Sequence, residues 1–166
     1  MKKSVTKMMR EFRSYWKHYV LQSLLATLVV FVVILSLSVD QDAVIIASIG
    51  ATAFVIFAMP GSITAKSKNV IGGHLVGLAC GFLSSLIPVP SCINPAIGHS
   101  FVYALAVGLS IFVMVVTDTE HPPAAGTALG VVVSGVSYRV TIAVVASAVL
   151  LSLIRKLFKP HIRDLT

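Results

Sequence analysis

Residues 117–130 read TDTEHPPAAGTALG and follow a long apolar run that ends at Val116. The stretch brings two acids, a histidine and two consecutive prolines before the chain turns to small residues. Each proline disfavours helical geometry in the residue before it, and a proline fits the first turn of a helix because its missing N–H would be unpaired there. This pattern predicts that one helix ends near Val116 and that a short helix starts at Pro122–Pro123.

The composition around this stretch is that of an integral membrane protein. The chain is 57% hydrophobic and only 11% charged, with a mean hydropathy of +0.95, whereas a soluble domain carries roughly 25% charged residues. Its formal charge of +7 comes mostly from the first 17 residues and from the tail beyond Arg139, which flank apolar runs. Positive-inside orientation explains these charges, and no motif indicates nucleic acid binding. Two cysteines are too few for a disulfide framework or a zinc site.

Six apolar runs organise the chain, and they predict an all-α polytopic membrane helix bundle. Four are long enough to span a bilayer and two are short or broken helices. The long runs cover residues 20–39, 70–87, 97–116 and 140–158, and the short ones residues 43–59 and 124–136. We expect a basic cytoplasmic lead at 1–19, one transmembrane domain at 20–159 and a short cytoplasmic tail at 160–166.

The number of crossings depends on the two short runs. Six crossings put Lys66 and Lys68 on the inner side with both termini and leave Arg139 outside, as the charge rule favours. If the short runs are re-entrant, four crossings remain and Lys66 and Lys68 lie outside. We favour six crossings. The order long, short, long occurs twice, and GATA at 50–53 resembles AGTA at 125–128, so a 3+3 inverted repeat is a further hypothesis.

Small residues recur every four positions in several runs. This spacing lines one face of a helix and lets another backbone approach closely within a bilayer. It occurs at Ser100, Ala104 and Gly108, and again at Gly126, Gly130 and Ser134. The predicted helix-packing positions are Gly73, Gly77, Gly81, Gly108 and Gly130.

The predicted short-helix start is also a candidate anion site. Free N–H groups at a helix N-terminus carry partial positive charge, and small residues let a ligand approach them. If the second run is broken before Ser48, residues 48–52 offer a second N-terminus that faces the first. The candidate substrate-binding residues are His121, Pro122, Pro123, Ala124, Ala125, Gly126, Thr127, Ser48, Gly50, Ala51, Thr52 and His74.

Simpler interpretations remain open at this point. The His-Pro-Pro segment fits a rigid cytoplasmic turn with Asp118 and Glu120 solvated, and His74 fits either a pathway lining or a hydrogen bond near the interface. The spacing of the histidines and Glu120 is no metal-ligand signature. No nucleophile elbow, HExxH helix or phosphate loop is present. We therefore expect no catalytic residue, no metal and no cofactor.

Three segments together resemble a known family. NVIGGH at 69–74, ALAVGLSIFVM at 104–114 and EHPPAAGTAL at 120–129 are similar to the HPP family of integral membrane proteins, named for the His-Pro-Pro motif. The resemblance runs from about Ala43 to the last span. It implies a transporter with four spans. Our count of six departs from this number, and the two short runs account for the difference. Plastid and cyanobacterial relatives are associated with nitrite, and some relatives carry a nucleotide-binding module of the CBS type, for which the sequence has no segment after the last span.

These observations predict a membrane transporter or channel for a small inorganic anion, with nitrite as the best single guess. The alternative is a non-transporting scaffold or accessory subunit whose glycine faces serve helix and oligomer packing. A cation or proton pathway through Asp118 or Glu120 is less favoured, because both acids lie at the membrane edge. We expect a homo-oligomer in the cell (inner) membrane, with both termini cytoplasmic and no nucleic acid partner.

Overall fold

The computed structural model describes residues 5–37 and 42–165, and within these ranges every regular element is helical. Residues 1–4 of the expected lead and residues 38–39 of the first expected span lie outside the described residues. The all-α prediction is confirmed for the described residues. The elements are α1 (Val5–Leu37), α2 (Ala43–Ala58), the 3-10 turn η1 (Ile63–Ala65), α3 (Ser67–Ser85), α4 (Pro95–Val116), α5 (Pro123–Ser134) and α6 (Tyr138–Phe158).

Local sequence signals set several of these boundaries. α4 starts at Pro95 behind Asn94, whose side chain accepts a hydrogen bond from the Ala96 N–H at 2.9 Å. α5 starts at Pro123, as the proline pair predicts, and ends before Gly135, which has a φ of 82°. Such a positive φ suits glycine because other residues meet a steric penalty there. α6 then starts behind Ser137, which caps the Arg139 N–H.

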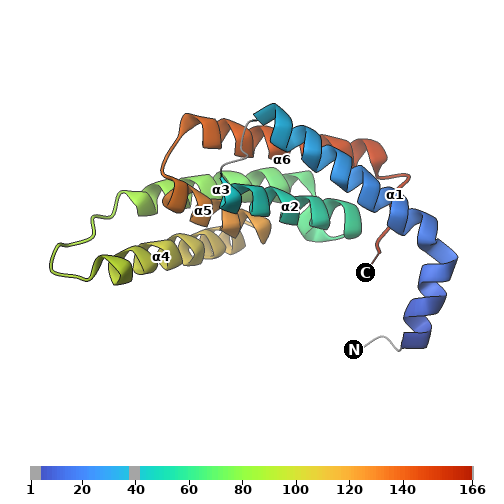
Figure 1. The fold of residues 1–166 in the computed structure, drawn as a ribbon, viewed down its shortest axis with the longest axis horizontal. Coiled ribbons are helices and arrows are strands. Elements are labelled where there is room, and N and C mark those ends of the chain that lie inside the picture. Colours follow the sequence, from blue (N-terminus) through green and yellow to red (C-terminus); the bar gives the residue numbers. More distant parts are fainter. Residues whose placement is uncertain (1–4, 38–41, 166) are drawn as a thin grey trace.

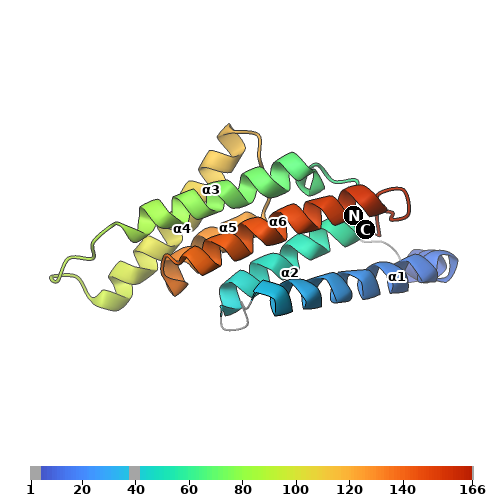
Figure 2. The same ribbon diagram turned by 90° about the horizontal axis from the view of Figure 1, so that it is seen from above.

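Successive helices run in alternating directions along the long axis of the molecule, and the short α5 lies in its middle (Figures 1 and 2). α3 packs against α4, α5 and α6, while α2 packs against α5 and α6, and α1 covers α2 from outside. Branched aliphatic residues from α1, α2, α3, α5 and α6 form the main core; its fully buried members include Val33, Ile45, Ile49, Val70, Val144 and Leu151.

α2 differs from one sequence expectation. It is a continuous helix from Ala43 to Ala58, so residues 48–52 lie in its middle and not at a second helix N-terminus. The physical reason is that nothing interrupts the backbone: the run contains no proline before Pro60, and none of its residues has a positive φ. The hypothesis of a break before Ser48 is therefore wrong.

One end of the molecule is tied together by polar contacts from distant segments. Gln22 of α1 donates to the carbonyl of Phe57 and, at 2.9 Å, to that of Arg163. Arg155 of α6 donates to the carbonyl of Pro60 after α2. The end of α2 therefore lies beside the α1 residues at which the first apolar run begins.

At the same end, Lys68 Nζ lies 2.6 Å from Asp118 Oδ2. This hydrogen bond and the charge of Lys68 hold the pKa of Asp118 below its usual range. Both side chains are largely exposed, so the pair marks the surface of the fold and is expected to add little to its stability. Asp118 also has a φ of 53°, an uncommon conformation that aspartate tolerates better than most residues.

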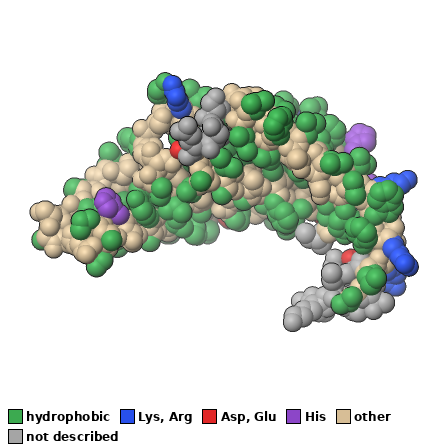
Figure 3. All heavy atoms as spheres, in the orientation of Figure 1, with side chains coloured by type: hydrophobic (Ala, Val, Ile, Leu, Met, Phe, Trp, Pro, Cys, Tyr) green, Lys and Arg blue, Asp and Glu red, His purple; other side chains and the backbone are tan. Residues whose placement is uncertain are grey.

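Three helices of the described residues are long and apolar enough to cross a membrane by length and composition: Met9–Leu37, Pro95–Val116 and Tyr138–Phe158. Ala43–Ala58 and Pro123–Ser134 are shorter apolar helices. Figure 3 shows apolar side chains along the visible length of the molecule, with the visible Lys and Arg side chains at its right-hand end and at one place on the upper edge left of centre. Such a surface suits a lipid environment.

Candidate functional site: a buried His–Thr cluster

Five polar side chains meet in the interior, and we call them the His–Thr cluster: Ser48 and Thr52 of α2, His74 of α3, His121 before α5, and Thr127 of α5. None is more than 4% exposed. Buried polar groups are costly unless they are hydrogen-bonded, and each of these five has a partner.

Thr52 lies at the centre of the cluster. Its Oγ1 atom is 2.9 Å from Nε2 of His74 and 3.1 Å from Nε2 of His121. It also lies 3.0 Å from the carbonyl oxygen of Ser48, one turn earlier in α2. The two imidazole rings stand 5.1 Å apart between centroids. A single hydroxyl therefore joins both histidines.

The other ring nitrogens make equally short contacts. Nδ1 of His74 lies 2.8 Å from Oγ1 of Thr127, which is itself 2.9 Å from Oγ of Ser48. Ser48 donates to the carbonyl of Pro123 at 2.7 Å. Nδ1 of His121 lies 2.8 Å from the carbonyl oxygen of Thr64. Because a carbonyl only accepts, His121 must carry a proton on Nδ1.

Glycines on α3 bring these helices close enough for the contacts to form. A Cβ on Gly73 would lie 2.7 Å from Cβ of His121, and one on Gly81 would lie 2.7 Å from the carbonyl oxygen of Ala128. At Gly77 a Cβ would collide with the carbonyl of Ala124. The three glycines thus form the face on which α5 rests. Gly130 serves the neighbouring interface, since a Cβ there would lie 2.5 Å from Cδ1 of Ile45 on α2.

Gly108 corrects a sequence expectation. A Cβ at this position would meet no atom within 4 Å, so Gly108 is not a packing position within this chain. The periodic small residues Ser100, Ala104 and Gly108 lie on the exposed face of α4. The spacing of small residues predicts a smooth face on α4, but it cannot predict whether that face packs against the other helices of the chain.

The predicted binding residues divide into three groups. Ser48, Thr52, His74, His121 and Thr127 come together in the cluster, and Pro123 joins them through its carbonyl. Gly126 adjoins the cluster, because a Cβ on it would lie 3.5 Å from Cβ of Ser48. The remaining candidates, Gly50, Ala51, Pro122, Ala124 and Ala125, contribute no polar side chain to it.

Gly50 and Ala51 are corrections with a simple cause. In a continuous helix, residues four apart share a face, so Ser48 and Thr52 point inward together, while Gly50 and Ala51 lie on the opposite side of the turn between them. A Cβ on Gly50 would meet no atom within 4 Å, and Ala51 is exposed. Pro122 is exposed as well.

The helix start of α5 is also not the set of free donors that the sequence predicted. The Ala124 N–H donates to the carbonyl of His121 at 2.8 Å, and the Ala125 N–H to that of Pro122 at 3.1 Å. Ala124 is fully buried, and its carbonyl lies against Gly77. A tight turn between His121 and Ala125 therefore uses these N–H groups, and the polar atoms that converge are side chains.

Sequence reasoning missed two contributors. The backbone carbonyl of Thr64 holds His121, and no sequence signal identifies a particular carbonyl. Asn69 is buried and its amide donates to the carbonyl of Glu120 at 3.2 Å, which fixes the segment before His121. The segment NVIGGH at 69–74 carries part of the family resemblance, but nothing in the sequence indicates the partner of its asparagine amide.

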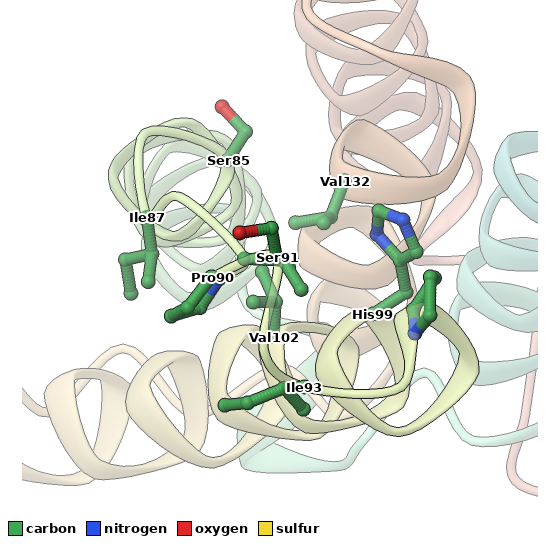
Figure 4. Close-up of a pocket in the computed structure, with 10 residues that line it drawn as sticks. Ser85, Ile87, Pro90, Ser91, Ile93, His99, Val102 and Val132 are labelled. Carbon is green, nitrogen blue, oxygen red and sulfur yellow. The ribbon is translucent and has the colours of Figure 1, made fainter.

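A pocket of about 460 Å³ lies at the end of the molecule away from Lys68. Figure 4 shows it between the end of α3, the α3–α4 connection, His99 and Val102 on α4, and Val132 on α5. Val132 follows Thr127 by five residues, or about 7–8 Å along a helix. Buried Ala128 and Val131 lie between the two positions. Among the described residues, no three His, Cys, Asp or Glu side chains are placed to hold a metal ion.

Comparison with known proteins identifies the family. The sequence matches the family described as "HPP, transmembrane region" over residues 12–161. It is 37% identical over 99 residues to a transmembrane protein of Dictyostelium discoideum, covering 60% of this chain and 33% of that protein. A second Dictyostelium transmembrane protein is 33% identical over 115 residues, covering 69% of this chain and 36% of that one. The chain thus spans about a third of the length of these curated relatives. No solved structure matches it. This protein has transmembrane helices and belongs to the HPP transmembrane family.

Proposed function

We propose that this protein transports a small inorganic anion across the membrane and that the His–Thr cluster is its binding site. The observation that carries the proposal is the convergence of three hydroxyls and two imidazoles, all nearly inaccessible to solvent, at the meeting point of α2, α3 and α5. To bind an anion, these groups must turn from their present partners and donate hydrogen bonds to it. None of them would hold the anion by a fixed charge, which allows rapid release.

The position of the carboxylates favours an anion over a metal cation. The cluster contains no Asp or Glu, and α2 and α5 have no ionisable side chain at all. Asp118, near the start of α5, is exposed and engaged by Lys68. Hard cations prefer oxygen ligands that include carboxylates, and none of the five cluster residues has a carboxylate.

The proposal includes a first substrate to test and a route by which the anion would reach the cluster. Nitrite is the first anion to test. The His-Pro-Pro motif indicates a family whose plastid and cyanobacterial members are associated with nitrite. The pocket beside Val132 would be the entrance on one side, with Ala128 and Val131 as the closed segment before Thr127. Transport then requires α5 to move relative to α3, across the glycine face that holds them together.

For the membrane topology we propose six crossings with both termini cytoplasmic in the cell (inner) membrane. The contacts of Gln22 with Phe57 and Arg163 support this. They place the end of α2 and the segment after α6 beside the start of the first apolar run, on the same side of the membrane. The exposed face at Ser100, Ala104 and Gly108 suits contact between copies, so we also expect a homo-oligomer.

The native Cys92 tests this topology. It is exposed in the α3–α4 connection, whereas Cys80 is buried. Six crossings place Cys92 outside, so a membrane-impermeant maleimide should label it in intact cells. In a Cys92→Ser background, Ser67→Cys should be labelled only after the cells are opened. Four crossings with re-entrant short helices predict the reverse for both positions, and that result would reject the six-crossing arrangement.

Anion flux into liposomes tests the function. We expect nitrite and nitrate uptake that exceeds uptake into protein-free vesicles. Gly126→Leu should reduce it strongly, because the side chain must grow beyond a Cβ that already lies 3.5 Å from Cβ of Ser48. Gly50→Leu is the matched control, since its Cβ meets no atom within 4 Å and Gly50 is not on the face of α4 proposed for contact between copies. Size-exclusion profiles report whether both variants fold. No flux of any small anion by intact wild-type protein would reject transport and favour the scaffold alternative.

A further inference from the structure

The contacts of the His–Thr cluster require more protons than its neutral groups hold. Seven hydrogen-bond contacts link the five side chains with one another and with the carbonyls of Ser48, Thr64 and Pro123. Each contact needs one proton. Three hydroxyls and two neutral imidazoles supply one proton each, which makes five. Two of the seven contacts therefore lack a proton when both histidines are neutral.

One of the missing protons can be assigned to particular atoms. The carbonyl of Thr64 takes the proton on Nδ1 of His121, so neutral His121 presents only a lone pair at Nε2. The single proton of Thr52 must then choose between Nε2 of His121 and the carbonyl of Ser48, 3.0 Å away. A proton added to Nε2 of His121 supplies one of the two missing protons: His121 then donates to Thr52, and Thr52 donates to the carbonyl of Ser48. The observed geometry thus accepts one additional proton without moving an atom.

The additional proton makes the cluster cationic, which has a cost in a buried site. A buried charge is expensive unless it is paired, and among the described residues no acid is in contact with the cluster. α2 and α5 carry no ionisable side chain, and Arg155 of α6 is directed at the carbonyl of Pro60. The other ionisable groups of the neighbouring segments are Lys66, Lys68, Cys80, Asp118 and Glu120, with Lys68 and Asp118 paired at the surface. A bound anion is the missing counter-charge.

We propose that the His–Thr cluster binds one proton together with each anion, so that the protein is a proton–anion symporter. This inference rests on the proposed anion transport. The proton enters as H⁺ on an imidazole lone pair and leaves from the same cluster, with no other bond formed or broken. Each ligand removes the main penalty of the other: the proton supplies charge for the anion, and the anion offsets the buried imidazolium. By linkage the two affinities must rise together.

The contacts also provide a path for the proton. His121, Thr52, His74, Thr127 and Ser48 form an unbroken series of hydrogen bonds between 2.8 and 3.1 Å. Each member both donates and accepts, so a proton that arrives at one imidazole can appear on the other through the Thr52 hydroxyl. Thr52 is therefore a relay, and either histidine can carry the charge.

The test uses the 166-residue chain in liposomes with nitrate as the probe. Nitrous acid crosses bilayers unaided, whereas the acid of nitrate is almost fully dissociated. The membrane potential is held at zero with potassium and an ionophore, and the outside is made about one pH unit more acidic. One-to-one symport should raise internal nitrate about tenfold above external nitrate at equilibrium, since one pH unit is a tenfold difference in proton activity. An entrapped pH dye should report one proton entering per nitrate.

Variants and outcomes separate the two proposals. His74→Gln and His121→Gln should abolish accumulation driven by the pH gradient and the matching dye signal. His161→Gln, in the exposed tail, is the control and should behave as wild type. Nitrate flux that equilibrates without proton entry would overturn proton coupling and leave anion transport standing. Absence of nitrate and nitrite flux in correctly folded wild-type protein would overturn both.

Discussion

Thr52→Val should reduce anion flux by about tenfold or more while leaving a folded protein. Valine keeps nearly the shape of threonine but removes the one hydroxyl that contacts Nε2 of both histidines. Leaving a buried polar group without its partner costs about 1–3 kcal/mol. A change of about 1.4 kcal/mol in binding already corresponds to a tenfold change in affinity. The loss of both contacts should therefore weaken the anion site and interrupt the proton relay.

Two further variants make this measurement specific. Thr52→Ser restores the hydroxyl with one methyl group less and should recover much of the initial flux rate. Thr141→Val is the matched control, because Thr141 is exposed on α6 and its hydroxyl contacts only the carbonyl of Ser137 in the same segment. Flux should be measured beside the melting temperature of each variant in detergent. Wild-type flux in Thr52→Val would show that the His–Thr cluster is not the transport site.

The helices of this protein could be located from the sequence because their signals are local. The proline pair started α5 within one residue of its predicted position, and Gly135 ended it. α2 was also located well, yet its interior was misjudged. Small residues such as Gly50 and Ala51 are compatible with a broken helix and with an intact one, and only the absence of proline and of positive φ distinguishes them.

The sequence could predict the members of the His–Thr cluster, but it could not predict how their side chains pair. Ser48, Thr52, His121 and Thr127 were candidates because they lie at the two helix N-termini that the sequence suggested, and His74 because it lies in the first turn of its span. Their pairing was beyond the sequence, since it depends on which face of α2 turns inward and on how closely α3 approaches α5. Donors were therefore assigned to the backbone of Ala124 and Ala125, whose N–H groups the turn after His121 already uses.

The glycine face of α3 provides the largest expected effect on stability. Gly77→Ala places a Cβ against the carbonyl of Ala124 and within 3.3 Å of Cβ of Thr127. The first of these is backbone inside a helix and cannot rotate away, so α5 must shift. Overpacking of this kind typically costs about 1–3 kcal/mol. Gly50→Ala makes the same chemical change in α2 where no atom lies within 4 Å, and should stabilise α2 by about 0.5–1 kcal/mol through the higher helix propensity of alanine. The melting temperature in detergent should therefore change in opposite directions for the two variants.

If Gly77→Ala melts like the wild type, the contact between α3 and α5 is looser than these distances imply. The close approach that assembles His74, His121 and Thr127 would then need another cause.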